Sequence, residues 1–314
     1  MAQVSIARLF EDNREKLRLE WIAGRDGGAK ALNSELTKDS SRGLIGHLNF
    51  IHPNLIQVLG ASEVAYLNGL DGAGSRAQLT QAATQELACY IVAGGEPAPT
   101  ALVEIAEARA TPLFRSPIAS VELMWMLRPY LARALAESST SHGVFLDVLG
   151  MGVLITGDSG VGKSELGLEL ISRGSGLIAD DVVELYRIGP ETVEGRCPAL
   201  LRDFLEVRGL GVLNIRTIFG EAALRPRKNL KLIVHLEKPT ALEGVPLERL
   251  PLKPGSEAVM GVDIRKVTIP VAAGRNLAVL TEAAVRNYVL QLRGFDSTQE
   301  FVNRQSRHIQ KRDK

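Results

Sequence analysis

The sequence predicts an α/β protein with a small N-terminal α/β domain, residues 1–130, and a larger C-terminal domain, residues 131–314. The chain of 314 residues is longer than one hydrophobic core usually supports, so two domains are expected, with one large α/β unit as the alternative. In the second half, apolar runs of strand length alternate with helical segments, which is typical of α/β folds. A glycine-rich loop follows one of these runs.

The composition is that of a globular protein without a marked charge imbalance. Hydrophobic residues make up 45% of the chain and charged residues 23%, with a net charge of +1, which excludes a disordered chain and a general nucleic-acid footprint. No apolar stretch of about 20 residues and no signal peptide is visible, so we expect a cytoplasmic protein without a membrane anchor. Cys89 and Cys197 lie in no metal-ligand or redox spacing and are expected to be buried.

In the N-terminal domain, a few segments carry a clear pattern. Loose helical spacing predicts a short surface helix from Ser5, a candidate N-cap, to about Ile22. Residues 55–59 and 89–93 are predicted strands bounded by turn residues. The leucine-rich stretch 120–136 predicts a long helix that connects the domains, with Pro129 either kinking it or marking its first turn.

The C-terminal domain shows the strand and helix alternation more strongly. Residues 144–148, 152–156 and 177–179 are predicted strands, and residues 164–172 are a predicted helix. The basic residues of segment 304–314 predict a helix end with a frayed tail. This order is the pattern of a nucleotide-binding core.

One segment matches the phosphate-binding pattern G-x-x-x-x-G-K-S at every fixed position. The flanking strand and helix distinguish it from an ordinary glycine-rich turn, because backbone N–H groups and the helix N-terminus then face a bound phosphate. We therefore expect a nucleoside triphosphate with Mg²⁺, with Lys163 at the terminal phosphates and Ser164 on the metal. The loop consists of Gly157, Asp158, Ser159, Gly160, Val161, Gly162, Lys163 and Ser164.

Two adjacent acids, Asp180 and Asp181, follow the predicted strand 177–179, at the strand end where α/β sites collect. Phosphoryl transfer needs one group for the acceptor hydroxyl and another for the metal. Repulsion between the two acids is expected to raise the pKa of one. Alone, such a pair is more often a solvated turn, but the phosphate loop upstream favours a catalytic interpretation.

Two further features stay open on pattern alone. The polar cluster Glu206–Arg216 is equally consistent with a salt-bridged turn and with a site, because its charges need partners in either case. His142 follows a polar run and fits a lone surface histidine better than a functional one. Neither feature can be assigned from its own neighbourhood.

The segment from Gly157 to Glu165, together with Leu205–Asn214 (LEVRGLGVLN), resembles the bifunctional HPr kinase/phosphorylase family. The resemblance extends over essentially the whole chain and includes the closing segment Ile269–Leu277. It implies a kinase that phosphorylates a serine of HPr, the small phosphocarrier of the sugar phosphotransferase system, with ATP or pyrophosphate as donor. It also implies removal of that phosphate by inorganic phosphate, which gives pyrophosphate. The implied protein is a cytoplasmic homohexamer whose catalytic domain is similar to phosphoenolpyruvate carboxykinase.

The resemblance also implies roles by position. Asp181 would accept the proton in phosphorylation and donate it in reverse, with support from Asp180. The other implied active-site residues are His142, Lys163 and Arg249, and the implied Mg²⁺ ligands are Ser164 and Glu206. The family loop that serves both directions corresponds to Leu205, Glu206, Val207, Arg208, Gly209, Leu210, Gly211, Val212, Leu213 and Asn214. The family's dephosphorylation loop corresponds to Val271, Ala272, Ala273, Gly274, Arg275 and Asn276.

Two departures from the family pattern limit the expectation. Family members often carry Arg-Pro where this chain has Ala272-Ala273, so the balance between the two activities stays open. The stretch Leu252–Ser256 also departs from the usual pattern, which weakens the assignment of Arg249. A regulatory nucleotide-binding module and a small-molecule kinase related to phosphoenolpyruvate carboxykinase are the alternative functions.

Overall fold

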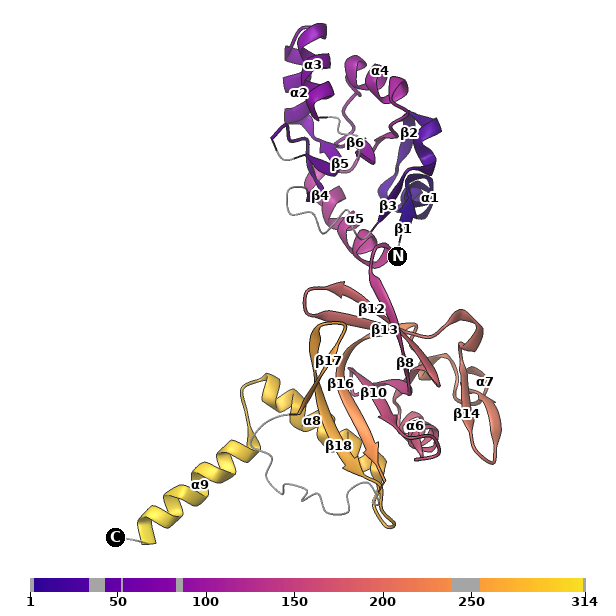
Figure 1. Ribbon diagram of the computed structural model, residues 1–314, viewed down its shortest axis with the longest axis vertical. Helices are drawn as coiled ribbons and strands as arrows, with labels where there is room; N and C mark the ends of the chain where they lie inside the picture. Colours follow the sequence, from indigo (N-terminus) through magenta and orange to yellow (C-terminus); the bar gives the residue numbers. More distant parts are fainter. Residues whose placement is uncertain (1–2, 34–42, 52, 83–86, 239–254, 313–314) are drawn as a thin grey trace. The chain divides into compact units, whose positions relative to one another are not determined.

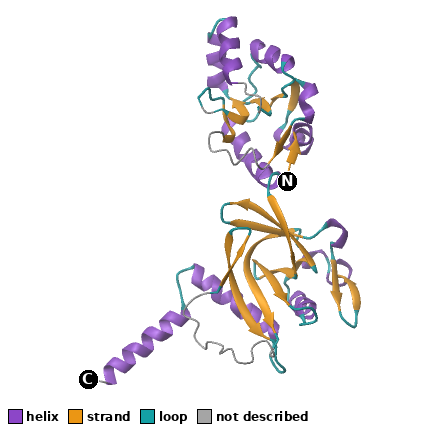
Figure 2. Ribbon diagram, in the orientation of Figure 1, coloured by secondary structure: helices purple, strands orange, loops and turns teal. Residues whose placement is uncertain are grey.

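The computed structural model describes residues 3–33, 43–51, 53–82, 87–238 and 255–312. The chain divides into two compact units, Met1–Glu137 and Ser138–Lys314. Both units combine helices and strands (Figures 1 and 2), so the predicted α/β fold class is confirmed.

The first unit contains a mixed sheet in the order β2-β7-β6-β5-β4. Its strands are β2 (Glu20–Ala23), β4 (Gly43–His47), β5 (Asn54–Leu59), β6 (Cys89–Val92) and β7 (Leu113–Arg115). Four of them, β4 to β7, run parallel, and β2 pairs antiparallel with β7. The predicted strands 55–59 and 89–93 are confirmed as β5 and β6, and every residue of β6 is buried, as expected of a central parallel strand.

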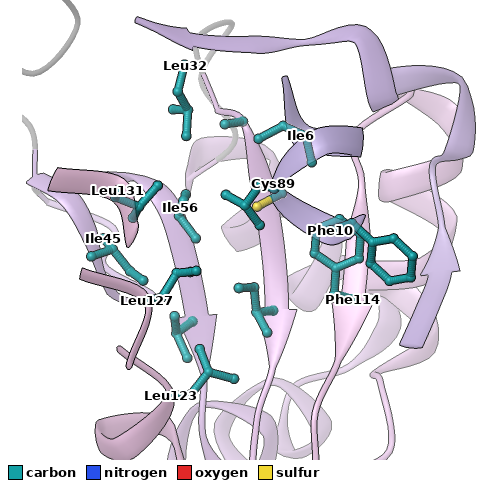
Figure 3. Packing of buried hydrophobic residues seen from close by; sticks show 14 of the residues in the cluster. Ile6, Phe10, Leu32, Ile45, Ile56, Cys89, Phe114, Leu123, Leu127 and Leu131 are labelled. Atoms are coloured by element: carbon teal, nitrogen blue, oxygen red, sulfur yellow. The ribbon is translucent and has the colours of Figure 1, made fainter. Parts of the chain in front are cut away.

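Helices cover both faces of this sheet. One face packs against α1 (Ile6–Leu17) and α5 (Ser120–Ala134), whose side chains meet Ile56, Cys89 and Phe114 in Figure 3. The other face packs against α2 (Ala61–Gly69), α3 (Gly72–Ala82) and α4 (Thr100–Ala108). A small pair of strands, β1 (Gln3–Ser5) and β3 (Ala31–Asn33), lies beside this core.

Of two helix predictions, one needs correction, and the other, the long helix 120–136, is confirmed as α5 with one of its two alternatives for Pro129 excluded. Ser5 does cap α1, since its Oγ accepts a hydrogen bond from the N–H of Arg8 at 3.2 Å, but the helix ends at Leu17 instead of Ile22. Arg18 adopts a left-handed conformation that closes the helix, and the chain then enters β2. In α5, Pro129 lies in the interior and not in the first turn. Its side chain is exposed, so water can satisfy the carbonyl that loses its partner.

The second unit contains a large mixed sheet in the order β11-β9-β10-β16-β13-β12-β8, with β18 beside β16 and β17 beside β18. Its strands are β8 (Glu137–His142), β9 (Val144–Val148), β10 (Met151–Gly157), β11 (Gly176–Ala179), β12 (Val182–Gly189), β13 (Thr192–Arg196), β16 (Arg227–Glu237), β17 (Ser256–Val259) and β18 (Val262–Pro270). The predicted strands 144–148, 152–156 and 177–179 are confirmed. Because β10, β16 and β18 run parallel, their carboxyl ends meet at one edge of the sheet.

One face of this sheet packs against α6 (Lys163–Ser172) and α8 (Leu277–Leu292). The same core takes in a hairpin of β14 (Phe204–Val207) and β15 (Gly211–Asn214), followed by α7 (Ile215–Phe219). The last helix, α9 (Ser297–Arg312), extends away from the sheet of its unit (Figure 1) and ends within the segment 304–314, as predicted, whereas residues 313–314 lie outside the described residues.

The structure also tests what the sequence predicts for the two cysteines and for membrane-spanning helices. Cys89 and Cys197 are both buried and unbridged, as predicted, and burial raises the pKa of Cys197 to about 11. A thiol with such a pKa stays protonated and unreactive near neutral pH. Within the part of the chain that the structure describes, no helix is long and apolar enough to cross a membrane.

Candidate active site

The phosphate-binding loop connects β10 to α6 at the carboxyl edge of the parallel strands. Gly157, Gly160 and Gly162 have φ values of 139°, 73° and 101°, which side chains other than glycine rarely adopt. A Cβ atom on Gly157 would also lie 2.5 Å from the carbonyl oxygen of Leu236 on β16. Gly162 is the N-cap of α6, and no described side chain caps this helix. The first N–H groups of α6 are therefore available to an anion.

Lys163 lies over this loop. Its Nζ donates hydrogen bonds to the carbonyl oxygens of Gly157 and Asp158, both at 2.9 Å. The ammonium group is thereby held where the loop backbone turns, beside the free N–H groups. This is the position from which a lysine can contact phosphates bound in such a loop.

A pocket of about 200 Å³ opens at the loop. It is lined by Gly143, Ser159, Gly160, Gly162, Lys163, Ser164, Glu165, Asp180, Asp181, Glu206 and Arg208. This volume is below the roughly 300–1,000 Å³ of sites that enclose a drug-sized ligand, so the pocket suits the phosphate chain of a nucleotide more than the whole molecule. Three segments that lie apart in the sequence meet here, namely the phosphate loop, the acid pair Asp180-Asp181 and the segment Glu206–Arg208.

Asp180 links three of the elements around the pocket. Its side chain is buried, and its Oδ2 accepts a hydrogen bond from the backbone N–H of Glu206 at 2.8 Å. Its Oδ1 accepts a weaker bond from the hydroxyl of Ser164 at 3.4 Å. Burial raises the pKa of Asp180, opposed by the N–H bonds from Glu206 and Asp181, with repulsion from Asp181 a smaller cause. The predicted rise is confirmed in direction, although burial and not repulsion dominates it.

Asp181 differs from its neighbour because it is exposed and strained. Its side chain is 75% exposed, and its φ is 63°. The N–H of Val182 donates to the carbonyl of Asp180 at 2.8 Å, which closes a tight three-residue turn around Asp181. Such backbone costs energy and is concentrated at functional sites. The turn places the carboxylate at the pocket, where another molecule can reach it.

His142 lies beside Asp181, at the end of β8. Its Nδ1 is 3.7 Å from Oδ1 of Asp181, and both side chains are largely exposed. The next residue, Gly143, donates its N–H to the carbonyl of Asp181 at 3.1 Å and lines the pocket. His142 itself is not among the residues that line it. The structure thus places His142 at the rim, in contact with the proposed base.

The hairpin brings Glu206 and Arg208 to the pocket. Along β14, Leu205 and Val207 are buried, whereas Glu206 between them is exposed, as expected of a strand with one covered face. Arg208 lies against the loop backbone, since a Cβ atom on Gly160 would be 3.1 Å from its Nη1. This part of the cluster is therefore part of the pocket and not an isolated salt-bridged turn.

Arg216, at the other end of the same cluster, does behave as a structural residue. Its Nε donates to Oδ2 of Asp203 at 2.8 Å, and its Nη1 contacts Glu221. It does not line the pocket. The cluster is thus divided between a pocket-lining residue, Arg208, and a salt-bridged residue, Arg216.

The oxygen donors in the pocket fit a magnesium ion. The hydroxyl of Ser164 and the carboxylates of Asp180 and Glu206 line the same space. Mg²⁺ prefers oxygen ligands and is commonly held by one or two carboxylates together with waters and substrate phosphates. Among the described residues, no group of three histidine, cysteine or acidic side chains is arranged to hold a metal ion by itself.

The predicted dephosphorylation loop lies on the other side of the phosphate loop. A second pocket, of about 460 Å³, is lined by Val161, Gly162, Glu165, Leu166, Glu169, Val271, Gly274, Arg275, Asn276 and Leu277. Asn276 caps α8 through the N–H of Val279 at 2.9 Å and donates to Glu169 of α6 at 3.3 Å. Ala272 and Ala273 do not line this pocket. Arg249 lies outside the described residues.

Sequence reasoning missed a polar chain at the end of β16. His235 contacts Oγ1 of Thr156 at 3.0 Å through Nδ1 and Glu237 at 3.3 Å through Nε2. Lys238 reaches Asp158 of the phosphate loop at 3.6 Å. A signal was present, because these polar residues directly follow the apolar run Leu232–Val234, at the end of a strand.

Comparisons with known proteins agree along the chain. The family model described as HPr Serine kinase N terminus matches residues 4–131, and the HPr Serine kinase C-terminal domain matches residues 133–305. An HPr kinase/phosphorylase of Nitrosomonas europaea is 61% identical over 304 residues, which cover 97% of this chain and 94% of the relative. One of Chromobacterium violaceum is 54% identical, covering 98% and 97%. A solved Hpr(Ser) kinase/phosphatase from Coxiella burnetii is 38% identical and covers 52% of this chain and 98% of its own, with a TM-score of 0.46.

Proposed function

The chain belongs to the HPr serine kinase family, and on this premise we propose that it phosphorylates a serine of the phosphocarrier HPr and removes that phosphate again. The observation that carries the proposal is the pocket in which the phosphate loop, the acid pair and the hairpin meet. An exposed carboxylate beside a phosphate-binding loop is the arrangement that phosphoryl transfer to a hydroxyl requires.

Asp181 is the general base of this proposal. Its exposed carboxylate can contact a serine on the surface of another protein, which a buried acid could not do. As the serine oxygen attacks the terminal phosphorus of ATP, Asp181 takes the hydroxyl proton, and ADP leaves. His142, 3.7 Å away, holds the orientation of Asp181, and Asp180 fixes the turn from below through its bond to Glu206.

The positive groups around the loop bind the phosphates. Lys163 and the N–H groups of α6 contact the transferred phosphate, and Arg208 adds a planar cation next to Gly160. Ser164 and Glu206 would hold Mg²⁺, which when bound neutralises charge on the phosphate oxygens. Arg249 stays a proposed active-site residue on the family resemblance alone.

The reverse reaction uses the same groups. Inorganic phosphate in the loop attacks the phosphorus of the phosphoserine, pyrophosphate forms, and Asp181 returns the proton to the serine oxygen. We assign Val271–Asn276 to this direction, because the second pocket, which this loop lines, shares Gly162 and Glu165 with the phosphate pocket. The proposal includes a cytoplasmic homohexamer with its catalytic groups in residues 131–314 and the N-terminal domain in residues 1–130.

A reconstitution with pure components tests the function. The protein, HPr, ATP and Mg²⁺ should yield HPr phosphorylated on serine, detected by mass spectrometry, and added inorganic phosphate should remove the group and release pyrophosphate. A protein that binds ATP but leaves HPr unmodified would instead be a regulatory nucleotide-binding module. Transfer to a metabolite in place of HPr would support the small-molecule kinase.

A further inference from the structure

Exposed apolar side chains gather on the hairpin and on the helix that follows it. Phe204, Leu210, Val212 and Ile218 are 42%, 65%, 66% and 55% exposed. We call these four residues the apolar rim. Single exposed apolar residues are ordinary on a protein surface, but several on adjoining elements mark an interaction surface.

The strand register places part of the apolar rim at the mouth of the phosphate pocket. Glu206 pairs with Val212, and Phe204 pairs with Asn214, so Phe204, Glu206 and Val212 share one face of the hairpin. Leu205 and Leu213 pair on the opposite face, where they pack into the core against α6. Since Glu206 lines the pocket, its neighbours Phe204 and Val212 flank the opening.

The other two members continue the same surface. Leu210 occupies the turn of the hairpin, two residues after Arg208, whose guanidinium lies against Gly160 of the phosphate loop. Ile218 lies in α7, directly after β15, and the nearby Arg216 is paired with Asp203 and Glu221. That cation is therefore paired within the fold and does not place an unpaired charge beside Ile218.

The reaction dictates what must cover this surface. The acceptor serine belongs to a protein, and its hydroxyl has to enter a pocket of about 200 Å³ to meet Asp181. The surface of that protein around the serine must then lie on the residues that flank the opening. We propose that the apolar rim is the docking surface for the protein substrate and contacts apolar side chains that flank its acceptor serine. This inference rests on the proposed kinase function.

The test separates docking from chemistry. Phe204→Ser and Ile218→Ser lie outside the loop Leu205–Asn214 and touch none of the groups assigned to catalysis. Each should raise KM for HPr on the order of tenfold, because each removes an apolar contact made only in the complex. The values of kcat and of KM for ATP should stay unchanged.

Two controls accompany these variants. Phe204→Leu keeps an apolar side chain and should retain most of the affinity for HPr, which a purely polar or structural role would not explain. Leu149→Ser removes a side chain of similar exposure, 53%, from the turn between β9 and β10 and should leave every kinetic constant unchanged. Thermal unfolding temperatures should not differ among the variants.

Several outcomes would overturn the inference. HPr phosphorylated with unchanged KM by both serine variants would remove the docking role while leaving the kinase function intact. A fall in molar mass by light scattering, with KM for HPr unchanged, would assign the apolar rim to contact with a second copy of the chain. Absence of HPr phosphorylation by the wild-type protein would instead remove the proposed function itself.

Discussion

The two units each place a helix directly after a parallel strand, yet the two helix N-termini differ. In the first unit, α2 follows β5, and the carboxylate of Glu63 accepts the N–H of Gly60 at 2.9 Å. In the second unit, α6 follows β10, and its N-cap Gly162 leaves the first turn without a described side-chain cap. At the first helix end, a carboxylate of the chain itself thus binds the N–H of the N-cap residue, whereas the N-terminus of α6 has no such side-chain cap and is available to phosphate.

The acids at the two edges show the same contrast. Glu63 is held by Gly60 and by His47, whose Nδ1 is 3.1 Å away. Among the described residues, Asp181 has an ion pair with the more distant His142, and its side chain is largely exposed. A strand, a turn and a helix therefore do not make a phosphate site by themselves. Left-handed glycines, a lysine over the backbone and an exposed acid are needed in addition.

Among the variants that compare the two units, Lys163→Ala should produce the largest effect, because α2 begins with Ala61 where α6 begins with Lys163. Loss of one charged donor at the transferred group typically costs about 10²- to 10³-fold in rate. We expect a loss of this size in HPr phosphorylation together with weaker ATP binding, measured by steady-state kinetics and calorimetry. Lys231→Ala, an exposed lysine on β16, serves as the control and should behave as wild type. Undiminished transfer by Lys163→Ala would contradict the assigned role.

Alanine substitutions at Gly157, which ends β10, and at Gly60, which follows β5, should lower the unfolding free energy by different amounts. Gly157→Ala would bring a Cβ within 2.5 Å of the Leu236 carbonyl at a φ of 139°, so we expect a loss of about 1–3 kcal/mol in unfolding free energy. Gly60→Ala meets only the movable side chains of Ser120 and Glu63, at 3.1 and 3.2 Å, and should cost less than about 1 kcal/mol. Chemical denaturation measures both. Equal losses would show that the phosphate loop is no more constrained than the other turn.

Glu63→Gln should change how stability depends on pH. Burial acts to raise the pKa of Glu63, but hydrogen bonds from His47 and from the N–H groups of Glu63 and Gly60 lower it overall. A lowered folded pKa contributes stability that is present above the unfolded value of 4.5 and is lost as the pH falls through the folded value. Glu63→Gln should therefore be less stable than wild type near neutral pH, by about 0.5–1 kcal/mol, and equal to it in acid.

The comparison for this prediction is Glu11→Gln, an exposed acid on α1. Its stability should follow the wild type at every pH in thermal unfolding scans. If the stability difference between Glu63→Gln and wild type stayed constant across the acid range, it would contradict the prediction that the ionised carboxylate of Glu63 stabilises the N-terminus of α2.

Asp181→Gly should have the smallest effect on stability. Unlike the preceding variants, it should not lower the unfolding free energy. Glycine adopts a φ of 63° without strain, so the unfolding free energy should be unchanged or higher by up to about 1 kcal/mol, although transfer is lost. Denaturation midpoints and HPr labelling, measured on the same sample, check this. A clear loss of stability would mean that the Asp181 side chain supports the fold.

Much of this architecture could be predicted because it depends on local pattern. The strands and helix around the phosphate loop follow from hydrophobic periodicity, and the acids from their place after a strand. The position of β16 could not be predicted, since it lies between β10 and β13, far from both in sequence. His235 near the end of β16 and Lys238 directly after it were missed because their partners Thr156 and Asp158 lie far from them in sequence. The different partners of Arg208 and Arg216 also depend on long-range packing that spacing does not encode.

Asp181→Asn in both reaction directions tests the central claim most directly. Asparagine tolerates the left-handed backbone and keeps the shape of the side chain, but it cannot accept the proton. With HPr, ATP and Mg²⁺, and then with phosphorylated HPr and inorganic phosphate, single-turnover rates should fall by about 10²- to 10⁴-fold while ATP affinity is kept. Asp263→Asn, an exposed acid on β18, should leave both rates unchanged. Wild-type rates for Asp181→Asn in either direction would contradict the account.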